Sequence, residues 1–221
     1  MLQKMTVVET VLLTPDILQL LLSPVEEFTY QAGDYVMLGF DAADLKPFSI
    51  ASAPRSDGLM SVHIRNHDDS DWMLTLFDVK RYDTLMVQGP KSQYQLSLPL
   101  NKPVIFVAGG TGFAPMKALL EVALTQNTDQ IIEFYWGART QEDLYLHTDM
   151  LSLCKQYPSL NYIPVVSDEP FAGRNGLVHK AVLQDHPSLA NFRVYLCGPW
   201  EMQATAKAEF LAAGLTECQF N

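Results

Sequence analysis

The sequence predicts two domains: an N-terminal six-stranded antiparallel β-barrel and a C-terminal α/β domain with a doubly wound parallel sheet. The chain has 221 residues, which is enough for two small domains. Six short strand-like runs separated by turn residues fill the first half, a pattern typical of a small antiparallel barrel. In the second half, apolar strand-sized runs alternate with helix-length segments, which indicates a parallel sheet covered by helices on both faces.

The barrel strands are expected where β-rich runs are bounded by turn residues. These runs are residues 6–13, 17–22, 35–40, 47–51, 59–64 and 84–88. Proline, glycine and aspartate mark the turns between them. A single helical segment interrupts the series at residues 72–79, because Trp72, Leu76 and Val79 repeat at helical spacing and fall on one face.

The second domain is expected to contain four strands and four helices. The strands are residues 104–108, 131–136, 162–166 and 194–197, and the helices are residues 115–124, 148–156, 178–183 and 201–213. Each strand is nearly continuous in apolar residues, as expected for strands that are buried on both faces. The domain boundary is expected between Pro99 and Pro103, which gives domains of residues 1–99 and 100–221.

The composition argues against several classes of function. Fifteen basic and twenty-five acidic side chains give a formal net charge of −10, and a surface this negative repels nucleic-acid phosphates and anionic lipids. The N-terminus lacks the apolar core of a signal peptide, and no stretch approaches the ~20 apolar residues of a membrane span. We therefore expect a soluble cytoplasmic protein that binds neither nucleic acid nor membranes.

The cysteines and histidines predict no metal site. Cys154, Cys197 and Cys218 lie too far apart for a Cys-x-x-Cys pair, and an odd number of cysteines suits a reducing compartment. Three distant thiols cannot hold an iron–sulfur cluster, which needs about four thiolates. The five histidines have no paired metal-binding spacing. A hydrolase is disfavoured because the sequence has no Gly-x-Ser-x-Gly motif.

The most informative motif is Gly109-Gly110-Thr111-Gly112, which lies between the apolar run 104–108 and the helix that contains Pro115. A turn without Cβ atoms lets a ligand approach the backbone, and the N-terminus of the following helix offers N–H groups to an anion. Open α/β sheets bind ligands beyond the carboxyl ends of their strands, where this turn is expected. The spacing matches neither the Gly-x-Gly-x-x-Gly motif nor a P-loop, so a tight turn without a ligand is the alternative.

Two further strand ends are expected at the same edge of the parallel sheet. Cys197-Gly198-Pro199 ends the last strand, and Arg139 follows the strand at residues 131–136. The guanidinium of Arg139 has the geometry to bind a ribose or phosphate oxygen. Its alternative is a surface ion pair with Glu142 or Asp143.

The barrel carries a further motif, Lys46-Pro47-Phe48-Ser49. Strand alternation puts Lys46 and Phe48 on one face and Pro47 and Ser49 on the other. Together with the two glycine turns, and in the same order along the chain, this motif resembles the ferredoxin reductase-like flavoenzymes. That superfamily has an Arg-x-aromatic-Ser motif, a Gly-Gly-Thr-Gly turn and a Cys-Gly-Pro turn. The length of the chain and its Pro-Phe-Ser-Ile-Ala-Ser sequence resemble the compact NAD(P)H-flavin reductases within it.

The resemblance implies a role for each motif. Residues 1–99 would bind a flavin, and residues 100–221 would bind NADH or NADPH. Ser49 would hydrogen-bond flavin N5, and Thr111 and Cys197 would lie near the nicotinamide. These three are the predicted catalytic residues. The full set of cofactor-binding residues that the resemblance implies is Lys46, Pro47, Phe48, Ser49, Val62, His63, Ile64, Gly109, Gly110, Thr111, Gly112, Arg139, Cys197, Gly198 and Pro199.

Two departures from the family pattern concern the flavin phosphates. Lys46 replaces the arginine of the family and loses the fork geometry of a guanidinium. Residues 65–71, Arg-Asn-His-Asp-Asp-Ser-Asp, replace the Gly-x-x-Ser/Thr turn with which tightly binding members hold the flavin pyrophosphate. Three carboxylates there repel a phosphate, so we expect a dissociable flavin, with riboflavin or FMN as acceptable as FAD. In the alternative interpretation, this segment is a solvated loop that caps the helix at Trp72.

We therefore predict an NAD(P)H:flavin oxidoreductase that transfers a hydride from NADH or NADPH to riboflavin, FMN or FAD. One alternative is a reductase subunit that retains its flavin and serves a separate oxygenase or iron–sulfur protein, so that a monooxygenase component is a candidate partner. Another is a nucleotide-binding regulatory module without turnover, which leaves the Pro47-Phe48-Ser49 motif unexplained. The choice between NADH and NADPH depends on the surroundings of Arg139, which the sequence does not fix. Phe220-Asn221 is interpreted either as a terminal aromatic that stacks on the flavin or nicotinamide, or as part of the core.

Overall fold

The computed structural model describes residues 1–126 and 129–220, so that Asn221 lies outside the described residues. Its contacts divide the chain into two compact units. The first is Met1–Leu96 with Lys117–Glu121, and the second is Ser97–Met116 with the chain from Val122 onward. Within the described residues, no helix is long and apolar enough to cross a membrane.

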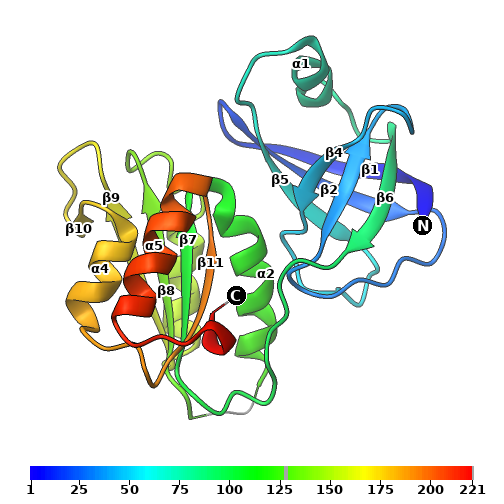
Figure 1. Ribbon diagram of the computed structural model, residues 1–221. Coiled ribbons are helices and arrows are strands. Elements are labelled where there is room, and N and C mark those ends of the chain that lie inside the picture. Colours follow the sequence, from blue (N-terminus) through cyan, green and yellow to red (C-terminus); the bar gives the residue numbers. More distant parts are fainter. Residues whose placement is uncertain (127–128, 221) are drawn as a thin grey trace. The chain divides into compact units, whose positions relative to one another are not determined.

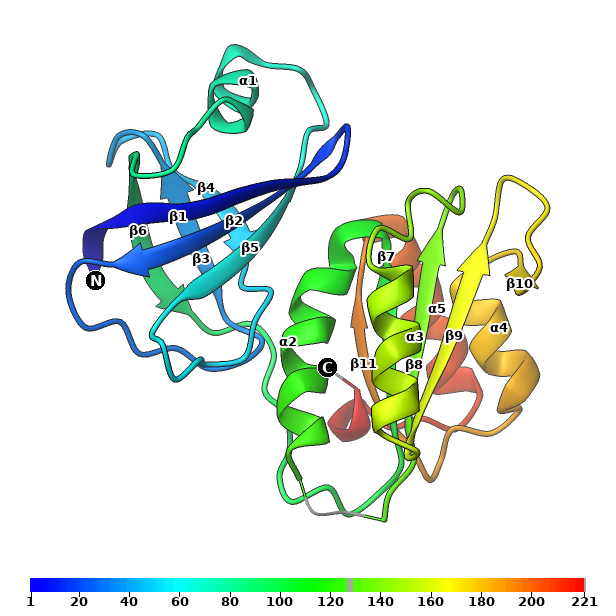
Figure 2. The same cartoon turned by 180° about the vertical axis from the view of Figure 1, so that it is seen from behind.

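Six antiparallel strands form the barrel of the first unit (Figure 1; Figure 2). Their order around the sheet is β4-β3-β6-β1-β2-β5. A backbone bridge between Ile50 and Val62 joins the chain after β4 to β5, and this bridge closes the ring. The six-stranded antiparallel barrel predicted from the sequence is confirmed. Its strands are β1 (Leu2–Thr14), β2 (Ile17–Pro24), β3 (Tyr35–Gly39), β4 (Lys46–Ser49), β5 (Met60–Arg65) and β6 (Thr84–Lys91).

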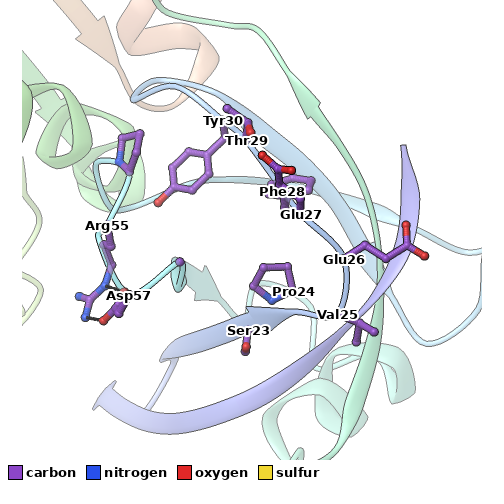
Figure 3. Close-up of a pocket in the computed structure, with 12 residues that line it drawn as sticks. Ser23, Pro24, Val25, Glu26, Glu27, Phe28, Thr29, Tyr30, Arg55 and Asp57 are labelled. Carbon is purple, nitrogen blue, oxygen red and sulfur yellow. Dashed lines mark hydrogen bonds and ion pairs between the residues drawn. The ribbon is translucent and has the colours of Figure 1, made fainter.

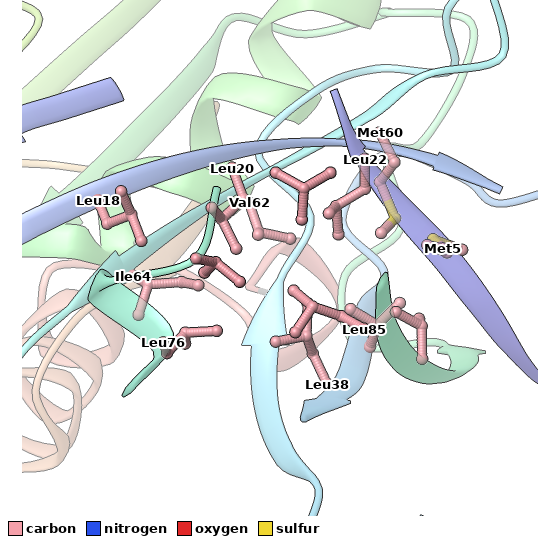
Figure 4. Close-up of a cluster of buried hydrophobic side chains, with 14 of the residues drawn as sticks. Met5, Leu18, Leu20, Leu22, Leu38, Met60, Val62, Ile64, Leu76 and Leu85 are labelled. Atoms are coloured by element: carbon pink, nitrogen blue, oxygen red, sulfur yellow. The ribbon is translucent and has the colours of Figure 1, made fainter. Parts of the chain in front are cut away.

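Alternating apolar side chains fill the barrel (Figure 4). Leu18, Leu20 and Leu22 of β2 all point inward because successive side chains of a strand face opposite sides. Helix α1 (Asp71–Phe77) packs on the same core. The predicted helical face is confirmed for Leu76, which is buried in the core, and for Trp72, which packs against it. Val79 is buried in the same core but lies beyond the end of the helix, which is shorter than predicted.

A five-stranded parallel sheet forms the centre of the second unit, in the order β10-β9-β8-β7-β11. Its strands are β7 (Val104–Gly109), β8 (Ile132–Ala138), β9 (Leu160–Val166), β10 (Arg174–Asn175) and β11 (Arg193–Cys197). The prediction missed β10, which is two residues long and has no apolar run of its own. Because the strands are parallel, their carboxyl ends meet at one edge of the sheet.

Helices cover both faces of this sheet, as predicted for a doubly wound domain (Figure 1; Figure 2). Side chains of α4 and α5 pack on one face, against residues such as Val107 and Leu196. Phe113 of α2 packs on the other face, where its ring meets Phe134 and Trp136. The helices are α2 (Phe113–Leu124), α3 (His147–Gln156), α4 (Val178–Asp185) and α5 (Trp200–Ala212).

The C-terminal aromatic belongs to the core of the second unit. Phe220 forms a parallel backbone bridge with Val194, near the start of β11, and its ring packs against the buried cluster that contains Val194. The structure therefore favours the core interpretation of Phe220 over stacking on a flavin or nicotinamide.

Candidate active site

The end of β4 borders an open hollow on the surface of the barrel. The hollow has a volume of about 460 Å³ and is lined by Tyr35, Pro47, Phe48, Ser49 and Gln93. Pairing of β3 with β4 sets Tyr35 opposite Ser49, and the carbonyl of Asp34 accepts a hydrogen bond from Ile50 N–H at 3.0 Å. Three of the predicted flavin-binding residues, Pro47, Phe48 and Ser49, therefore share one hollow.

Lys46 contacts Trp72 rather than the hollow, whereas Phe48, which the alternation puts on the same face as Lys46, both contacts Trp72 and lines the hollow. The ammonium group of Lys46 is 4.3 Å from the centre of the Trp72 ring, and Phe48 stacks on the same ring at 6.2 Å between centres. Lys46 is not among the residues that line the 460 Å³ hollow. Its charge is directed toward the helix end at Trp72, where a flavin phosphate would have to compete with the cation–π contact.

Carboxylates order the loop before α1. Ser70 caps the helix, since its Oγ accepts a hydrogen bond from Met73 N–H at 3.3 Å. Asp68 in turn accepts from Ser70 N–H at 3.1 Å, and Asp69 accepts from the Asn66 side chain at 2.7 Å. The capping interpretation of this segment is confirmed. The exposed carboxylates of this loop would repel a phosphate group.

The predicted residues on β5 differ from one another in what they can offer a ligand. Val62 and Ile64 point into the barrel core and are fully buried. His63 is buried on the opposite face, where burial, with the nearby charge of Lys117 as a lesser cause, lowers its pKa to about 3. His63 is therefore neutral at physiological pH. Contact of these three residues with a flavin stays a prediction.

In the second unit, the two glycine turns pack directly on each other. Cys197 pairs with Ala108 across β11 and β7, which brings the Cys197-Gly198-Pro199 turn beside Gly109–Gly112. A Cβ at Gly112 would overlap the Cys197 carbonyl oxygen, and a Cβ at Gly109 would overlap the Met202 sulfur. The expectation that the missing side chains of Gly109 and Gly112 make room for a ligand is therefore wrong. Protein atoms, rather than a ligand, fill the space that the missing side chains leave.

Thr111 is partly exposed to solvent at the carboxyl edge of the sheet. The indole N–H of Trp136 donates to the Gly110 carbonyl at 3.0 Å and so orients the turn. Thr111 is half-buried, as are Cys197 and Gly198. Trp200, the first residue of α5, is 81% exposed directly after Pro199. The predicted nicotinamide-binding residues thus form one cluster at the carboxyl edge of the sheet, with an exposed indole beside them.

Arg139 lies at the same edge, beyond the end of β8. Its Nε donates to Asp168 Oδ2 at 2.8 Å, although 82% of the arginine side chain is exposed. The ion pair is therefore formed with Asp168, which follows β9, rather than with the Glu142 or Asp143 expected from the sequence. Parallel pairing of β8 with β9 explains this partner, because it sets Ala138 opposite Val166.

A second hollow of the barrel contains none of the predicted residues among those that line it. It measures about 510 Å³ and lies between residues 23–30 and the turn at 54–58 (Figure 3). The Tyr30 hydroxyl donates to the Ala53 carbonyl at 2.9 Å, and Arg55 pairs with Asp57 at 2.5 Å. These polar groups are satisfied by the barrel itself, so we assign the hollow no role.

Comparison with known families matches both units. A family model described as an FAD-binding domain matches residues 2–90, and one described as an oxidoreductase NAD-binding domain matches residues 106–208. The NAD(P)H-flavin reductase of Vibrio harveyi is 30% identical over 200 residues, which cover 87% of this chain and 84% of that protein. The chain belongs to the NAD(P)H-flavin reductase family. The resemblance inferred from the motifs is confirmed.

Some relatives are longer than this chain. The CDP-6-deoxy-L-threo-D-glycero-4-hexulose-3-dehydrase reductase of Yersinia pestis is 34% identical over 208 residues, which cover 92% of this chain. The chain spans 62% of the length of that relative. Among solved structures, the Amycolatopsis cytochrome P450 reductase GcoB matches with a TM-score of 0.91 and 25% identity, over 100% of this chain and 69% of that chain. This family comprises flavin- and nicotinamide-dependent oxidoreductases.

Four residues at these sites were not identified from the sequence as binding residues. Tyr35 and Gln93 line the hollow beside Ser49, Trp200 borders the glycine turns, and Asp168 holds Arg139. Of these four, Trp200 carried a signal in the sequence, because it directly follows the Cys197-Gly198-Pro199 motif. The positions of Gln93 and Asp168 depend on which strands pair, and this pairing cannot be deduced from the local sequence.

Proposed function

We propose that the protein is an NAD(P)H:flavin oxidoreductase that transfers a hydride from a nicotinamide nucleotide to riboflavin, FMN or FAD. The observation that carries the proposal is the hollow beside Ser49, on a unit that matches FAD-binding domains. Residues 1–99 would bind the flavin and residues 100–221 the nucleotide, in line with the two family matches. The flavin supplies the redox chemistry, and the protein supplies binding and orientation.

Ser49 is the proposed catalytic residue of the barrel. Its hydroxyl can donate a hydrogen bond or accept one, so it can follow the change in charge and protonation at flavin N5. Phe48 and Tyr35 offer aromatic surfaces to the isoalloxazine ring, and Pro47 fixes the strand beside it. In the second unit, Thr111 and Cys197 would contact the nicotinamide, and Trp200 is available to stack on a planar ring.

The flavin is proposed to be a dissociable substrate. Asp68, Asp69 and Asp71 surround the start of α1, and Ser70 already caps that helix. A resident flavin nucleotide needs cations or free N–H groups for its phosphate. Lys46 is the nearby cation on β4, and its ammonium lies over Trp72.

A second candidate function is that of a flavin-retaining reductase that serves a separate protein. The relatives named above include a dehydrase reductase and a cytochrome P450 reductase, and this supports a protein acceptor. Under this alternative, the purified protein keeps a yellow flavin through gel filtration.

The test is oxidation of NADH or NADPH by desalted protein as free flavin is added. The proposal predicts no oxidation until riboflavin, FMN or FAD is present, and saturation as its concentration rises. Oxidation that is independent of added flavin, by protein that is already yellow, would support the second candidate. No oxidation with any flavin would contradict both.

A further inference from the structure

The carboxyl edge of the parallel sheet has a hollow of its own beyond β8 and β9. Its volume is about 570 Å³, and Thr140, Gln141, Glu142 and Glu169 line it. Thr140 directly follows Arg139, and Glu169 directly follows Asp168, so the hollow adjoins the Arg139–Asp168 ion pair. We call it the edge hollow. It lies within the span that matches NAD-binding domains.

Carboxylates accept hydrogen bonds from several donors around the edge hollow. Glu169 accepts a hydrogen bond from Gln141 N–H at 2.6 Å. Asp143 accepts from both the N–H and the hydroxyl of Thr140, at 3.1 and 3.0 Å. Asp168 accepts from Arg139, and hydrogen bonds from Ser167 and Arg139 lower the pKa of Asp168. Each of these acidic groups accepts at least one hydrogen bond from a neighbouring donor.

The charge around the edge hollow is therefore negative. Glu142, Asp143, Asp168 and Glu169 contribute four carboxylates, against the one guanidinium of Arg139. Arg174 on the neighbouring strand β10 donates to the carboxylate of Asp185 and to Gln184, both on α4. An additional phosphate at this edge would face more negative than positive charge.

The distance between the glycine turns and the edge hollow is short enough for one dinucleotide to reach both. Strand β9 is two positions from β7 in the sheet, and neighbouring strands lie roughly 4.8 Å apart. The edge hollow is lined from the ends of β8 and β9, which are one and two positions from β7, so it lies roughly 5–10 Å along the sheet edge from the turn at Gly109–Gly112. With the nicotinamide at the glycine turns, the adenosine ribose can reach the hollow.

We propose that the edge hollow receives the adenosine ribose and makes the enzyme selective for NADH over NADPH. This inference rests on the proposed function. Glu142 and Glu169 can accept hydrogen bonds from ribose hydroxyls, whereas the same carboxylates repel the 2′-phosphate of NADPH. Asp168 acts as a positioning residue, because it holds the guanidinium that a 2′-phosphate would otherwise recruit. The ion pair is exposed and hence contributes little energy by itself, so repulsion by the neighbouring carboxylates is the larger obstacle to a 2′-phosphate.

The first test compares kcat/KM for the two nucleotides with saturating FMN. We expect kcat/KM to be at least about tenfold higher for NADH, since like charges at close range disfavour the wrong ligand. Salt screens exposed charges, so the ratio should fall as ionic strength rises. Equal values, or a preference for NADPH, would overturn the inference.

Two variants test the named residues. Asp168→Asn, which removes the carboxylate paired with Arg139, and Glu169→Gln, which removes a charge at the hollow, should each raise kcat/KM for NADPH about three- to tenfold. The ratio of kcat/KM for NADH to kcat/KM for NADPH should therefore fall in both variants. Glu217→Gln is the matched control, because Glu217 is also acidic, exposed and ion-paired, with Lys207 at 3.0 Å. Glu217 lies near Phe220, which pairs with the start of β11 rather than its carboxyl end. An equal gain in that control, or no gain in either variant, would contradict the assignment.

Calorimetric titration with NAD⁺ and NADP⁺ separates this inference from the proposed function. Tighter binding of NAD⁺ by protein that oxidises neither reduced nucleotide would support the selectivity and contradict the reductase activity. Turnover that favours NADPH would do the reverse. Binding of neither nucleotide would overturn the inference as well.

Discussion

Ser49 is the residue on which the proposed chemistry depends most. It is half-buried in the wall of the hollow, at the last position of β4. Ser49→Ala should lower kcat at saturating flavin about ten- to a hundredfold, because losing one hydrogen bond to the reacting atom costs about 1–3 kcal/mol of barrier. Ser56→Ala, an exposed serine of the same unit, should leave kcat unchanged. Unchanged turnover in Ser49→Ala would remove Ser49 from the mechanism.

His63 gives the barrel a dependence of its stability on pH. Its pKa falls from 6.5 to about 3 on burial, so the unfolded chain binds a proton that the folded chain does not. The free energy of unfolding should therefore decrease as the pH falls from about 6.5, by up to about 1.4 kcal/mol per pH unit from this group. Urea unfolding at several pH values should show a flatter dependence for His63→Asn than for the wild-type protein. The exposed His67, changed in the same way, is the control and should keep the wild-type slope.

Among the elements, the contact between the two glycine turns is the most sensitive to added volume. Gly109→Ala and Gly112→Ala should each lower the free energy of unfolding by about 1–3 kcal/mol, since a methyl group inserted into a packed contact forces neighbours to move. Met202→Ala should partly restore Gly109→Ala, because the overlapping atom there is a flexible side chain. It should not restore Gly112→Ala, which overlaps backbone. Equal rescue of both variants would contradict this packing.

The loop before α1 is expected to set the response to the flavin phosphate. Asp68→Asn keeps an oxygen that can accept from Ser70 N–H but removes a charge, so KM for FMN should fall about two- to threefold. KM for riboflavin, which has no phosphate, should not change. Asp78→Asn at the other end of α1 is the control. A change in KM that is the same for FMN and riboflavin would show that the loop does not sense the phosphate.

At the level of elements, the sequence predicts what depends on local pattern. The alternation in Leu18, Leu20 and Leu22 and the continuous apolar run at β7 are each visible in a few residues, and both strands were predicted. Pairing between distant segments is not visible in this way. The Arg139–Asp168 ion pair and the contribution of Gln93 to the Ser49 hollow depend on which strands lie side by side. Strand β10 has too few residues to carry a pattern.

At the scale of the whole molecule, overall charge and local charge have different consequences. The formal net charge of −10 disfavours polyanionic partners in general. The carboxylates near α1 and around the edge hollow act on particular phosphates of two small molecules. The same acidic composition thus gives two separate expectations, a flavin that dissociates and a nucleotide without a 2′-phosphate.

The central claim is that the protein passes a hydride from NADH to a free flavin. The most direct measurement is an anaerobic reaction of desalted protein in catalytic amount with NADH and excess FMN, followed by the absorbances of NADH and oxidised flavin together. We predict that one flavin is reduced for each NADH consumed, over many turnovers. Loss of NADH without reduction of free flavin, or reduction that stops after one equivalent of protein, would contradict the claim.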